Sequence, residues 1–259
     1  MIKDDIIKAA LAAKEAGSTR FCMGAAWRDV LNRPSAFNKI VDSVKEVKAM
    51  GMEVCCTLGM LEEWQAQKLK EAGLTAYNHN LDTSREHYPK IITTRTYDER
   101  LQTIEHVRNA GISVCSGGII GLGEKHEDRV GLLHTLSTLP EHPESVPVNA
   151  LLAVKGTPLE DQPKVEILDM VRMIATARII MPKSTIRLSA GRVNFSIAEQ
   201  AMCFLVGANS IFTGDKLLTT PNNDKSEDSK MFDILGLLPK PANFAQGSDK
   251  IPAPKEATA

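Results

Sequence analysis

The stretches 14–22 (KEAGSTRFC), 48–56 (KAMGMEVCC), 70–78 (KEAGLTAYN) and 108–116 (RNAGISVCS) decide the fold of this chain, because they repeat one local pattern. Each places a basic residue in the last turn of an expected helix, then a glycine suited to a left-handed C-cap, then a short strand. The capping glycines are Gly17, Gly51, Gly73 and Gly111. A helix-to-strand unit therefore occurs four times.

Helices are expected throughout the rest of the chain. The apolar positions between 37 and 50 follow the three-and-four spacing of one buried helical face, with an N-cap at Ser35. Ser196 and Glu199 have the spacing of a capping box, which predicts the start of another helix. Further helical segments are expected near residues 127–139, 164–181 and 196–206.

Strands alternate with these helices, which is typical of a parallel sheet. They are expected at residues 20–24, 53–58, 75–80, 113–120, 146–154, 185–190 and 210–213. Seven strands are one fewer than the eight that close a (β/α) barrel, and the chain opens with a helix. We therefore expect an α/β fold, a (β/α)8 TIM-type barrel that is incomplete at the N-terminus and lacks its first strand.

The domain organisation follows from length and from a change of pattern near the end. The 259 residues are 43% apolar, which is enough for one sizeable core. The helix-and-strand pattern weakens after Gly214. We expect a barrel over residues 1–215 and a C-terminal tail over residues 216–259, laid across the barrel and partly disordered.

Composition narrows the class of partner. The 31 basic and 32 acidic residues give a formal net charge of −1, so no overall field attracts nucleic acid or an anionic membrane. No apolar run approaches the roughly 18 residues of a membrane helix, and no targeting signal is evident. Five cysteines in a chain of this length do not indicate a disulfide framework. A small-molecule partner and a reducing compartment are expected.

Polar side chains inside the expected strands indicate a site, because function in such barrels concentrates where strands end. Six strands contribute thiols, amides and a guanidinium: Cys22, Cys55, Asn78 with Asn80, Cys115, Asn149 and Arg187. The period of two along a strand puts Cys55 and Cys56 on opposite faces. At most one of these two thiols therefore faces inward.

The cysteines divide into two groups. A lone buried cysteine usually packs as a small apolar residue, and Cys56 and Cys203 are interpreted in that way. Cys22, Cys55 and Cys115 each follow a helix-ending glycine by four or five residues, so they occupy equivalent positions that converge in a barrel. Thiolates suit zinc or an iron–sulfur group, and three of them leave one coordination position open.

Two further features call for a ligand or a partner. Arg187 lies inside an expected strand, and a buried charge needs an anionic partner. The stretch CSGGIIGLGE, residues 115–124, ends a strand and starts a helix. Its glycines would let a ligand approach the backbone, as in nucleotide sites, although a tight turn between strand and helix is the simpler alternative.

Several longer strings are similar to one family. RFCMGAAW, YNHNLDTS, ITTRTYDERL, VCSGGIIGLGE, ESVPVNALLAVKGTPL, RLSAGR and AMCFLVGANSIFTGDKLLTTPNND occur in this order over about residues 8–224 and resemble the biotin synthases. The resemblance implies a radical S-adenosylmethionine (SAM) barrel with two iron–sulfur clusters that inserts sulfur into dethiobiotin to form biotin. It also implies a homodimer that receives electrons from a donor of flavodoxin or ferredoxin type.

The resemblance assigns roles to individual residues. Those that match the ligands of the family's [2Fe–2S] cluster, thought to be the sulfur source, are Cys22, Cys55, Cys115 and Arg187. Those that match SAM contacts are Met23, Gly24, Ala25, Asn80, Asp82, Gly117, Ile119, Gly121 and Glu124. Those that match dethiobiotin contacts are Asn80, Asn149, Thr219 and Thr220. Arg187 would fill the coordination position that three thiolates leave open.

One departure from the family concerns its [4Fe–4S] cluster, which is bound through Cys-x3-Cys-x2-Cys. These 259 residues do not contain that spacing. We therefore expect an N-terminally truncated form, with the motif upstream of Met1, that alone makes neither 5′-deoxyadenosine nor biotin. The family occurs in bacterial cytoplasm and in the mitochondrial matrix, and either compartment suits this chain.

Two alternatives of other classes stay open at this point. One is a non-catalytic SAM or [2Fe–2S] binding protein derived from the family. The other is a zinc or Schiff-base barrel enzyme of the aldolase kind, which would explain neither the strand arginine nor the long matching strings. Zinc in place of iron and sulfide would favour the second alternative.

Overall fold

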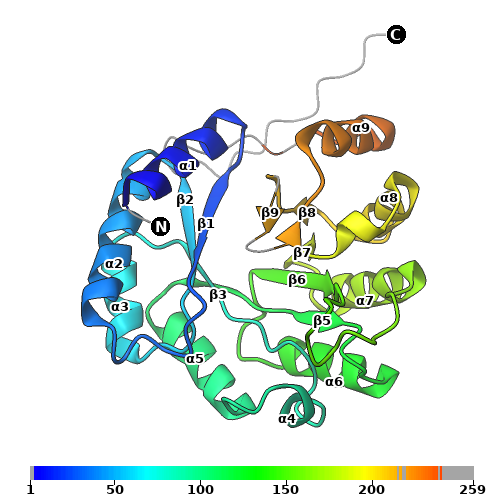
Figure 1. Ribbon diagram of the computed structural model, residues 1–259, viewed down its shortest axis with the longest axis horizontal. Coiled ribbons are helices and arrows are strands. Elements are labelled where there is room, and N and C mark those ends of the chain that lie inside the picture. The colour runs from blue at the N-terminus through cyan, green and yellow to red at the C-terminus, as the bar shows by residue number, and fades with distance from the viewer. Residues whose placement is uncertain (1–2, 215, 218–219, 239, 241–259) are drawn as a thin grey trace.

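The computed structural model describes residues 3–214, 216–217, 220–238 and 240, which form a curled parallel sheet with helices on its outer side (Figure 1). Its strands are β1 (Arg20–Gly24), β2 (Glu53–Thr57), β3 (Ala76–Asn78), β4 (Ser113–Cys115), β5 (Gly118–Ile120), β6 (Ser145–Ala150), β7 (Thr185–Leu188) and β8 (Ser210–Ile211). They pair in parallel in the order β1-β2-β3-β4-β6-β7-β8, and β5 pairs with β6. The expected barrel-type α/β fold is confirmed.

The helices are α1 (Lys3–Glu15), α2 (Pro34–Ala49), α3 (Glu63–Glu71), α4 (Tyr88–Ile91), α5 (Tyr97–Asn109), α6 (His126–Ser137), α7 (Ile167–Ile180), α8 (Ile197–Leu205) and α9 (Lys225–Leu235). The four glycines of the repeat all have a positive φ, between 69° and 95°, which explains why the pattern needs glycine there. The capping box at the start of α8 is also confirmed, because the Ser196 side chain accepts from the Glu199 N–H.

Some expected boundaries are wrong. Helix α2 begins at Pro34 with Arg33 at the N-cap, so Ser35 lies within the first turn; proline suits this position because its missing N–H would be unpaired anyway. The segment 113–120 forms two short strands, β4 and β5, with a break at residues 116–117. The expected strand 146–154 is β6, which ends at Ala150.

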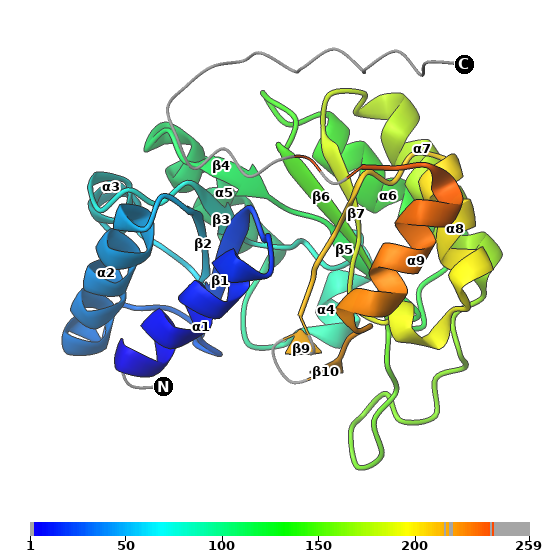
Figure 2. The ribbon, with the colours of Figure 1, turned by 90° about the horizontal axis from the view of Figure 1, so that it is seen from above.

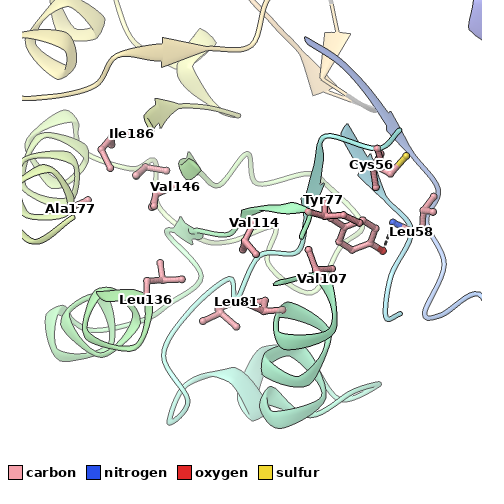
Figure 3. Packing of buried hydrophobic residues seen from close by; sticks show 14 of the residues in the cluster. Cys56, Leu58, Tyr77, Leu81, Val107, Val114, Leu136, Val146, Ala177 and Ile186 are labelled. Carbon is pink, nitrogen blue, oxygen red and sulfur yellow. Dashed lines mark hydrogen bonds between the residues drawn. The ribbon is translucent and has the colours of Figure 1, made fainter. Parts of the chain in front are cut away.

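One apolar core lies between the sheet and the helices. Figure 3 shows Cys56, Tyr77 and Val114 on the helix side of the sheet, in the same cluster as Val107 of α5 and Leu136 of α6. The buried Tyr77 hydroxyl donates to the Gly59 carbonyl at 2.6 Å and accepts from the Leu58 N–H at 3.0 Å. Both backbone groups after β2 are thereby satisfied, which holds the end of that strand in place.

The sheet is open between β1 and β8, which do not pair within the described residues. The hydroxyls of Ser18 and Thr213, which flank these two strands, lie 3.1 Å apart. No helix of the described part of the chain is long and apolar enough to cross a membrane.

The C-terminal segment contains more structure than its sequence pattern indicates. β9 (Lys216–Leu217) pairs with β10 (Thr220–Pro221) in antiparallel fashion, and α9 follows. Figure 2 shows α9 beside α8. The rings of Phe204 in α8 and Phe232 in α9 meet edge to face, with 5.6 Å between their centroids. The prediction of disorder at the end of the chain falls on residues 241–259, which lie outside the described residues.

Candidate functional site

Strand register brings the predicted cluster ligands to one side of the sheet. Cys22 lies opposite Cys55 in the β1–β2 pair, and their thiols are hydrogen-bonded to each other. Cys115 of β4 lies opposite Asn78, whose Nδ2 donates to its sulfur at 3.4 Å. Cys56 points the other way into the helix-side core, so the predicted strand phase is confirmed. We call Cys22, Cys55, Cys115 and Arg187 the thiol face.

The Cys22 and Cys55 thiols differ in acidity. The hydrogen bond from Cys55 lowers the pKa of Cys22 to about 7, and the positive charges of Arg187 and Arg20 act in the same direction. Donation to Cys22, together with burial, raises the pKa of Cys55 well above its ordinary value. Since the exposed Cys22 is the thiol that ionises first, the pair is suited to present a thiolate.

Arg187 is only 8% exposed, and the two side chains that contact its guanidinium group most directly, Ser210 and Phe212, are neutral. Its Nε donates to the Ser210 hydroxyl at 3.0 Å, and its guanidinium lies 4.5 Å from the centroid of the Phe212 ring. Within the described residues no carboxylate lies at ion-pair distance from it. The expected anionic partner is therefore not a carboxylate of the described chain.

The thiol face does not match the geometry of a single metal ion. Among residues 3–214 and the described residues after them, no three His, Cys, Asp or Glu side chains lie close enough together to hold one ion. A structural zinc ion takes four ligands around one centre, which disfavours the zinc alternative. The thiol face instead offers a contacting pair, Cys22 with Cys55, and two groups on other strands, Cys115 and Arg187.

Glycines shape the second part of the site, residues 117–124, which we call the glycine turn. A Cβ on Gly117 would lie 2.0 Å from the Pro147 carbonyl oxygen, and one on Gly118 would lie 2.8 Å from that of Asp82. The Ile119 N–H donates to the Asp82 carbonyl at 2.8 Å. Asp82 itself has a φ of 67°, a backbone conformation that aspartate tolerates better than most residues. The segment after β3 therefore lies directly against the glycine turn.

Glu124 holds the far end of the glycine turn. Its two carboxylate oxygens accept from the Gly121 N–H at 3.0 and 3.1 Å, and Arg129 pairs with it at 2.8 Å. Arg129 also pairs with Asp169 of α7 at 2.9 Å. The Glu124 side chain is 2% exposed. This carboxylate is thus fully engaged in fixing the turn.

The two asparagines predicted near dethiobiotin also bind the glycine turn. Asn80 Oδ1 accepts from the Gly117 N–H at 3.2 Å. Asn149 Nδ2 donates to the Gly118 carbonyl at 2.9 Å, and its Oδ1 accepts from the Ala190 N–H at 3.1 Å. Both amides are therefore held by backbone, with fixed orientations, at the junction of β3, β5 and β6.

A cavity of about 400 Å³ opens beside the glycine turn. It is lined by Asp82, Ile91, Ile92, Thr93, Thr94, Arg95, Arg100, Ile119 and Leu122. Arg100 pairs with Asp82 at 2.9 Å. Burial raises the pKa of Asp82, while the charges of Arg100 and Arg95 oppose that shift. Two guanidinium groups against one carboxylate give the cavity a positive balance, suited to a ligand that carries a carboxylate.

Asp82 and Ile119, which match SAM contacts of the family, line this cavity together with Arg95 and Arg100, to which the sequence analysis assigns no role. Both stand in the string ITTRTYDERL. Arg95 Nε is buried without a hydrogen-bond partner among the described residues. Arg95 lies between α4 and α5 and Arg100 lies in α5, and in an isolated sequence two such arginines look no different from those of a solvated surface.

The remaining predicted residues lie at the ends of β1 and in the C-terminal hairpin. Met23 and Gly24 close β1, and the Ala25 N–H donates to the Thr57 carbonyl at 2.9 Å, so this segment follows the end of β2. Thr220 belongs to β10. Thr219 lies outside the described residues.

Two family profiles match the sequence. The profile described as "Radical SAM superfamily" matches residues 1–136. The profile described as "Biotin and Thiamin Synthesis associated domain" matches residues 147–238.

Curated relatives match at high identity. "Biotin synthase, mitochondrial" of Arabidopsis thaliana is 71% identical over 246 residues, which cover 95% of this chain and 65% of that protein. "Biotin synthase" of Cytophaga hutchinsonii is 69% identical over 236 residues, which cover 91% of this chain and 70% of that protein. The chain thus spans about two thirds of the length of these relatives.

Solved structures with similar folds are more distant in sequence. Methylornithine synthase superposes with a TM-score of 0.78 at 23% identity, covering 94% of this chain and 74% of that one. The FeFe-hydrogenase maturase HydG of Carboxydothermus hydrogenoformans has a TM-score of 0.76 at 16% identity, covering 92% of this chain and 59% of that one. At these identities the likeness supports the barrel fold alone.

Proposed function

Since this chain belongs to the biotin synthase family of radical SAM proteins, we propose that it binds SAM and dethiobiotin and holds the sulfur-donating cluster of biotin formation. The observation that carries this proposal is the thiol face. There, two hydrogen-bonded thiols on β1 and β2 and a buried arginine on β7, without a carboxylate partner among the described residues, lie on the same face of one sheet.

The residues proposed to hold the [2Fe–2S] cluster are Cys22, Cys55, Cys115 and Arg187. A bound cluster of this type would supply the sulfur that enters dethiobiotin. Burial of the Arg187 guanidinium costs less when it faces an anionic group, which thiolate-bound iron–sulfur groups provide. The depressed pKa of Cys22 supports a ligand role, because metal binding requires the thiolate.

The SAM site is proposed at the cavity beside the glycine turn. Asp82 would accept hydrogen bonds from ribose hydroxyls, and Ile119 would pack against the adenine. Gly117 and Gly121 would allow the ligand to approach the backbone, while Glu124 keeps the turn in place. Met23, Gly24 and Ala25 are proposed to receive the methionine part.

Dethiobiotin is proposed to lie between the thiol face and the glycine turn. Asn80 and Asn149 would face its ureido ring, with orientations fixed by their backbone hydrogen bonds. Thr219 and Thr220 are proposed to bind its carboxylate. A homodimer, an electron donor of flavodoxin or ferredoxin type, and a bacterial cytoplasmic or mitochondrial matrix location are further proposals from the family. The family's [4Fe–4S] motif is not in these residues, and none of them is assigned to it.

The test is anaerobic reconstitution with iron and sulfide, followed by calorimetric titration with SAM and then dethiobiotin. We expect about two irons and two sulfides per chain, and dethiobiotin binding that strengthens when SAM is present. Asp82→Asn is expected to weaken SAM binding and leave the iron content unchanged. Cys22→Ser is expected to lower the iron content and leave SAM binding unchanged. Binding of one zinc ion without sulfide, or no binding of either small molecule, would contradict the proposal.

A further inference from the structure

Arg192, which the proposed function does not use, is the most deeply buried charged side chain near the C-terminal segment. It opens the short 3-10 helix η1 (Arg192–Asn194) after β7 and is 1% exposed. Its NH1 and NH2 groups donate to the two carboxylate oxygens of Asp228 at 2.6 and 2.8 Å. A two-pronged pair of this kind fixes orientation as well as distance between its elements, here η1 and α9.

The rest of the Arg192 guanidinium joins three other segments. NH1 also donates to Gln200 Oε1 of α8 at 3.0 Å, and Nε donates to Asn222 Oδ1 at 3.1 Å. NH2 donates to the Phe212 carbonyl at 3.2 Å. One side chain thus connects η1, α8, the end of β8, the residues after β10, and α9.

Asn222 closes the segment that contains the β9–β10 hairpin. Its Nδ2 donates to the carbonyls of Phe212 and Gly214, at 3.0 and 2.9 Å. The two ends of the hairpin segment are therefore tied together, and Arg192 contacts both of them. The Phe212 ring, in turn, lies over the Arg187 guanidinium at 4.5 Å.

Apolar contacts alone could dock α9 onto the barrel. Met231 is buried, and Phe232 meets Phe204 of α8 edge to face. Burying an ion pair instead of apolar side chains usually brings little net stability, because both ions lose their hydration. What the pair adds is a specific geometry, and the groups that this geometry orients are the hairpin and Phe212.

We propose that Arg192, through Asp228 and Asn222, is a positioning residue that sets the β9–β10 hairpin and Phe212 against the interior of the barrel. This inference rests on the proposed function in one respect: the hairpin carries Thr220, assigned above to the dethiobiotin carboxylate. Arg192 thereby acts on substrate binding and on the Arg187 side of the thiol face. The SAM cavity lies beside β3 and β5 and is outside its reach.

The test compares Arg192→Lys and Asp228→Asn with the unaltered chain. The first keeps the charge and loses the planar fork, and the second keeps the shape and loses the charge. We expect faster amide hydrogen exchange in the described residues of 212–223, and dethiobiotin affinity that falls by roughly tenfold or more. SAM affinity should stay within about twofold of the unaltered chain, because substitutions at distant sites without shared partners have independent effects.

Phe232→Leu is the matched control, because it weakens the packing of α9 against α8 through Phe204, which is not one of the residues hydrogen-bonded to Arg192. It should lower the melting temperature without changing exchange in 212–223. The proposal is overturned if both Arg192 and Asp228 variants leave that exchange unchanged, or if Phe232→Leu raises it equally. Where Arg192→Lys does not fold, Asn222→Ala removes one arm of the same network. Failure of the unaltered chain to bind dethiobiotin would overturn the proposed function, while the exchange data would still decide the role of Arg192.

Discussion

The thiol face and the glycine turn are adjacent, yet they differ in how far their polar groups are satisfied. In the glycine turn, the Gly121 N–H, Glu124 and Arg129 form a closed chain of hydrogen bonds and ion pairs. On the thiol face, Arg187 has no carboxylate partner, and the buried Ser145 hydroxyl opposite Cys115 has no hydrogen-bond partner within the described residues.

The difference separates two ways of preparing a site. A turn whose polar groups already bond to one another keeps its shape with or without a ligand. Such a turn contacts a ligand mainly through its backbone and leaves space for it. A face with an unsatisfied hydroxyl and a guanidinium that has no anionic partner among the described residues is complete only when a ligand supplies these partners. Substitutions should therefore abolish binding at the thiol face and loosen structure at the glycine turn.

The largest effect is expected on the thiol face. Cys22→Ala, Cys55→Ala and Cys115→Ala should each reduce bound iron after anaerobic reconstitution from about two per chain to almost none. Cys56→Ala and Cys203→Ala are the controls and should keep the iron, because both thiols pack in the helix-side core. Iron analysis and the visible absorption spectrum measure the result. If Cys56→Ala lost its iron and Cys55→Ala retained it, the ligands would lie on the opposite face of the sheet and the present assignment would be wrong.

The glycine turn should respond in stability. Arg129→Met leaves the 2%-exposed Glu124 carboxylate without its cation, and breaking a buried pair in this way costs roughly 3–5 kcal/mol. Urea unfolding measures the loss. Adding Glu124→Gln should recover part of it, since the uncompensated charge is then removed. A cost for Arg129→Met below about 1 kcal/mol would mean that water satisfies Glu124 and that the turn is not held by this network.

A steric change in the turn should have an intermediate effect. Gly117→Ala would place a Cβ 2.0 Å from the Pro147 carbonyl oxygen, so β6 or the turn must shift, at roughly 1–3 kcal/mol. SAM affinity should fall with stability. Gly156→Ala is the control, because its φ of +84° is strained for alanine but nothing lies within 4 Å. It should cost stability and leave SAM affinity unchanged; equal SAM binding by both variants would separate the turn from the SAM site.

The smallest effect is expected at the hydrogen bond that β3 makes to the thiol face. Asn78→Ala removes the 3.4 Å hydrogen bond to the Cys115 sulfur, which favours the more negative, reduced state of a bound cluster. Iron should be retained, and the midpoint potential should fall by roughly 20–60 mV, the one-electron equivalent of a weak hydrogen bond. Asn209→Ala, which removes a hydrogen bond to the Ile186 N–H instead, should leave the potential unchanged. An equal shift of the midpoint potential in both variants would mean that it comes from a general loss of structural order and not from the hydrogen bond to Cys115.

Much of the fold was predictable because its signals are local. The glycines of the repeat need a positive φ, and the apolar spacing of α2 marks its buried face over nearly four turns. The break between β4 and β5 was not predictable, since it depends on the Gly117 backbone meeting Pro147 of a strand thirty residues later in the chain. Helix α9 was also missed: its only buried side chains are Asp228 and Met231, so it has no continuous apolar stripe.

The candidate site was predictable to the level of strand phase. Alternation along β2 separates Cys55 from Cys56 without any knowledge of neighbours. The roles of the partners were not predictable, because they depend on contacts between distant segments. Glu124 is predicted beside SAM, but its contacts with the Gly121 N–H and Arg129 have no signal in the sequence. Arg192 stands in a quoted string, RLSAGR, with no hint of Asp228.

The placement of the thiol face on β1, β2, β4 and β7 makes any group that binds it a cross-link between distant parts of the chain. A ligand that binds the folded chain and not the unfolded chain stabilises the folded state by mass action. At this face it would also cross-link segments that separate when the chain unfolds. The melting temperature should therefore report how fully the face is loaded. Removal of iron should lower the cooperativity between the β1–β4 half and the β6–β8 half. Across the open edge between β1 and β8, the described residues supply a contact between the Ser18 and Thr213 hydroxyls.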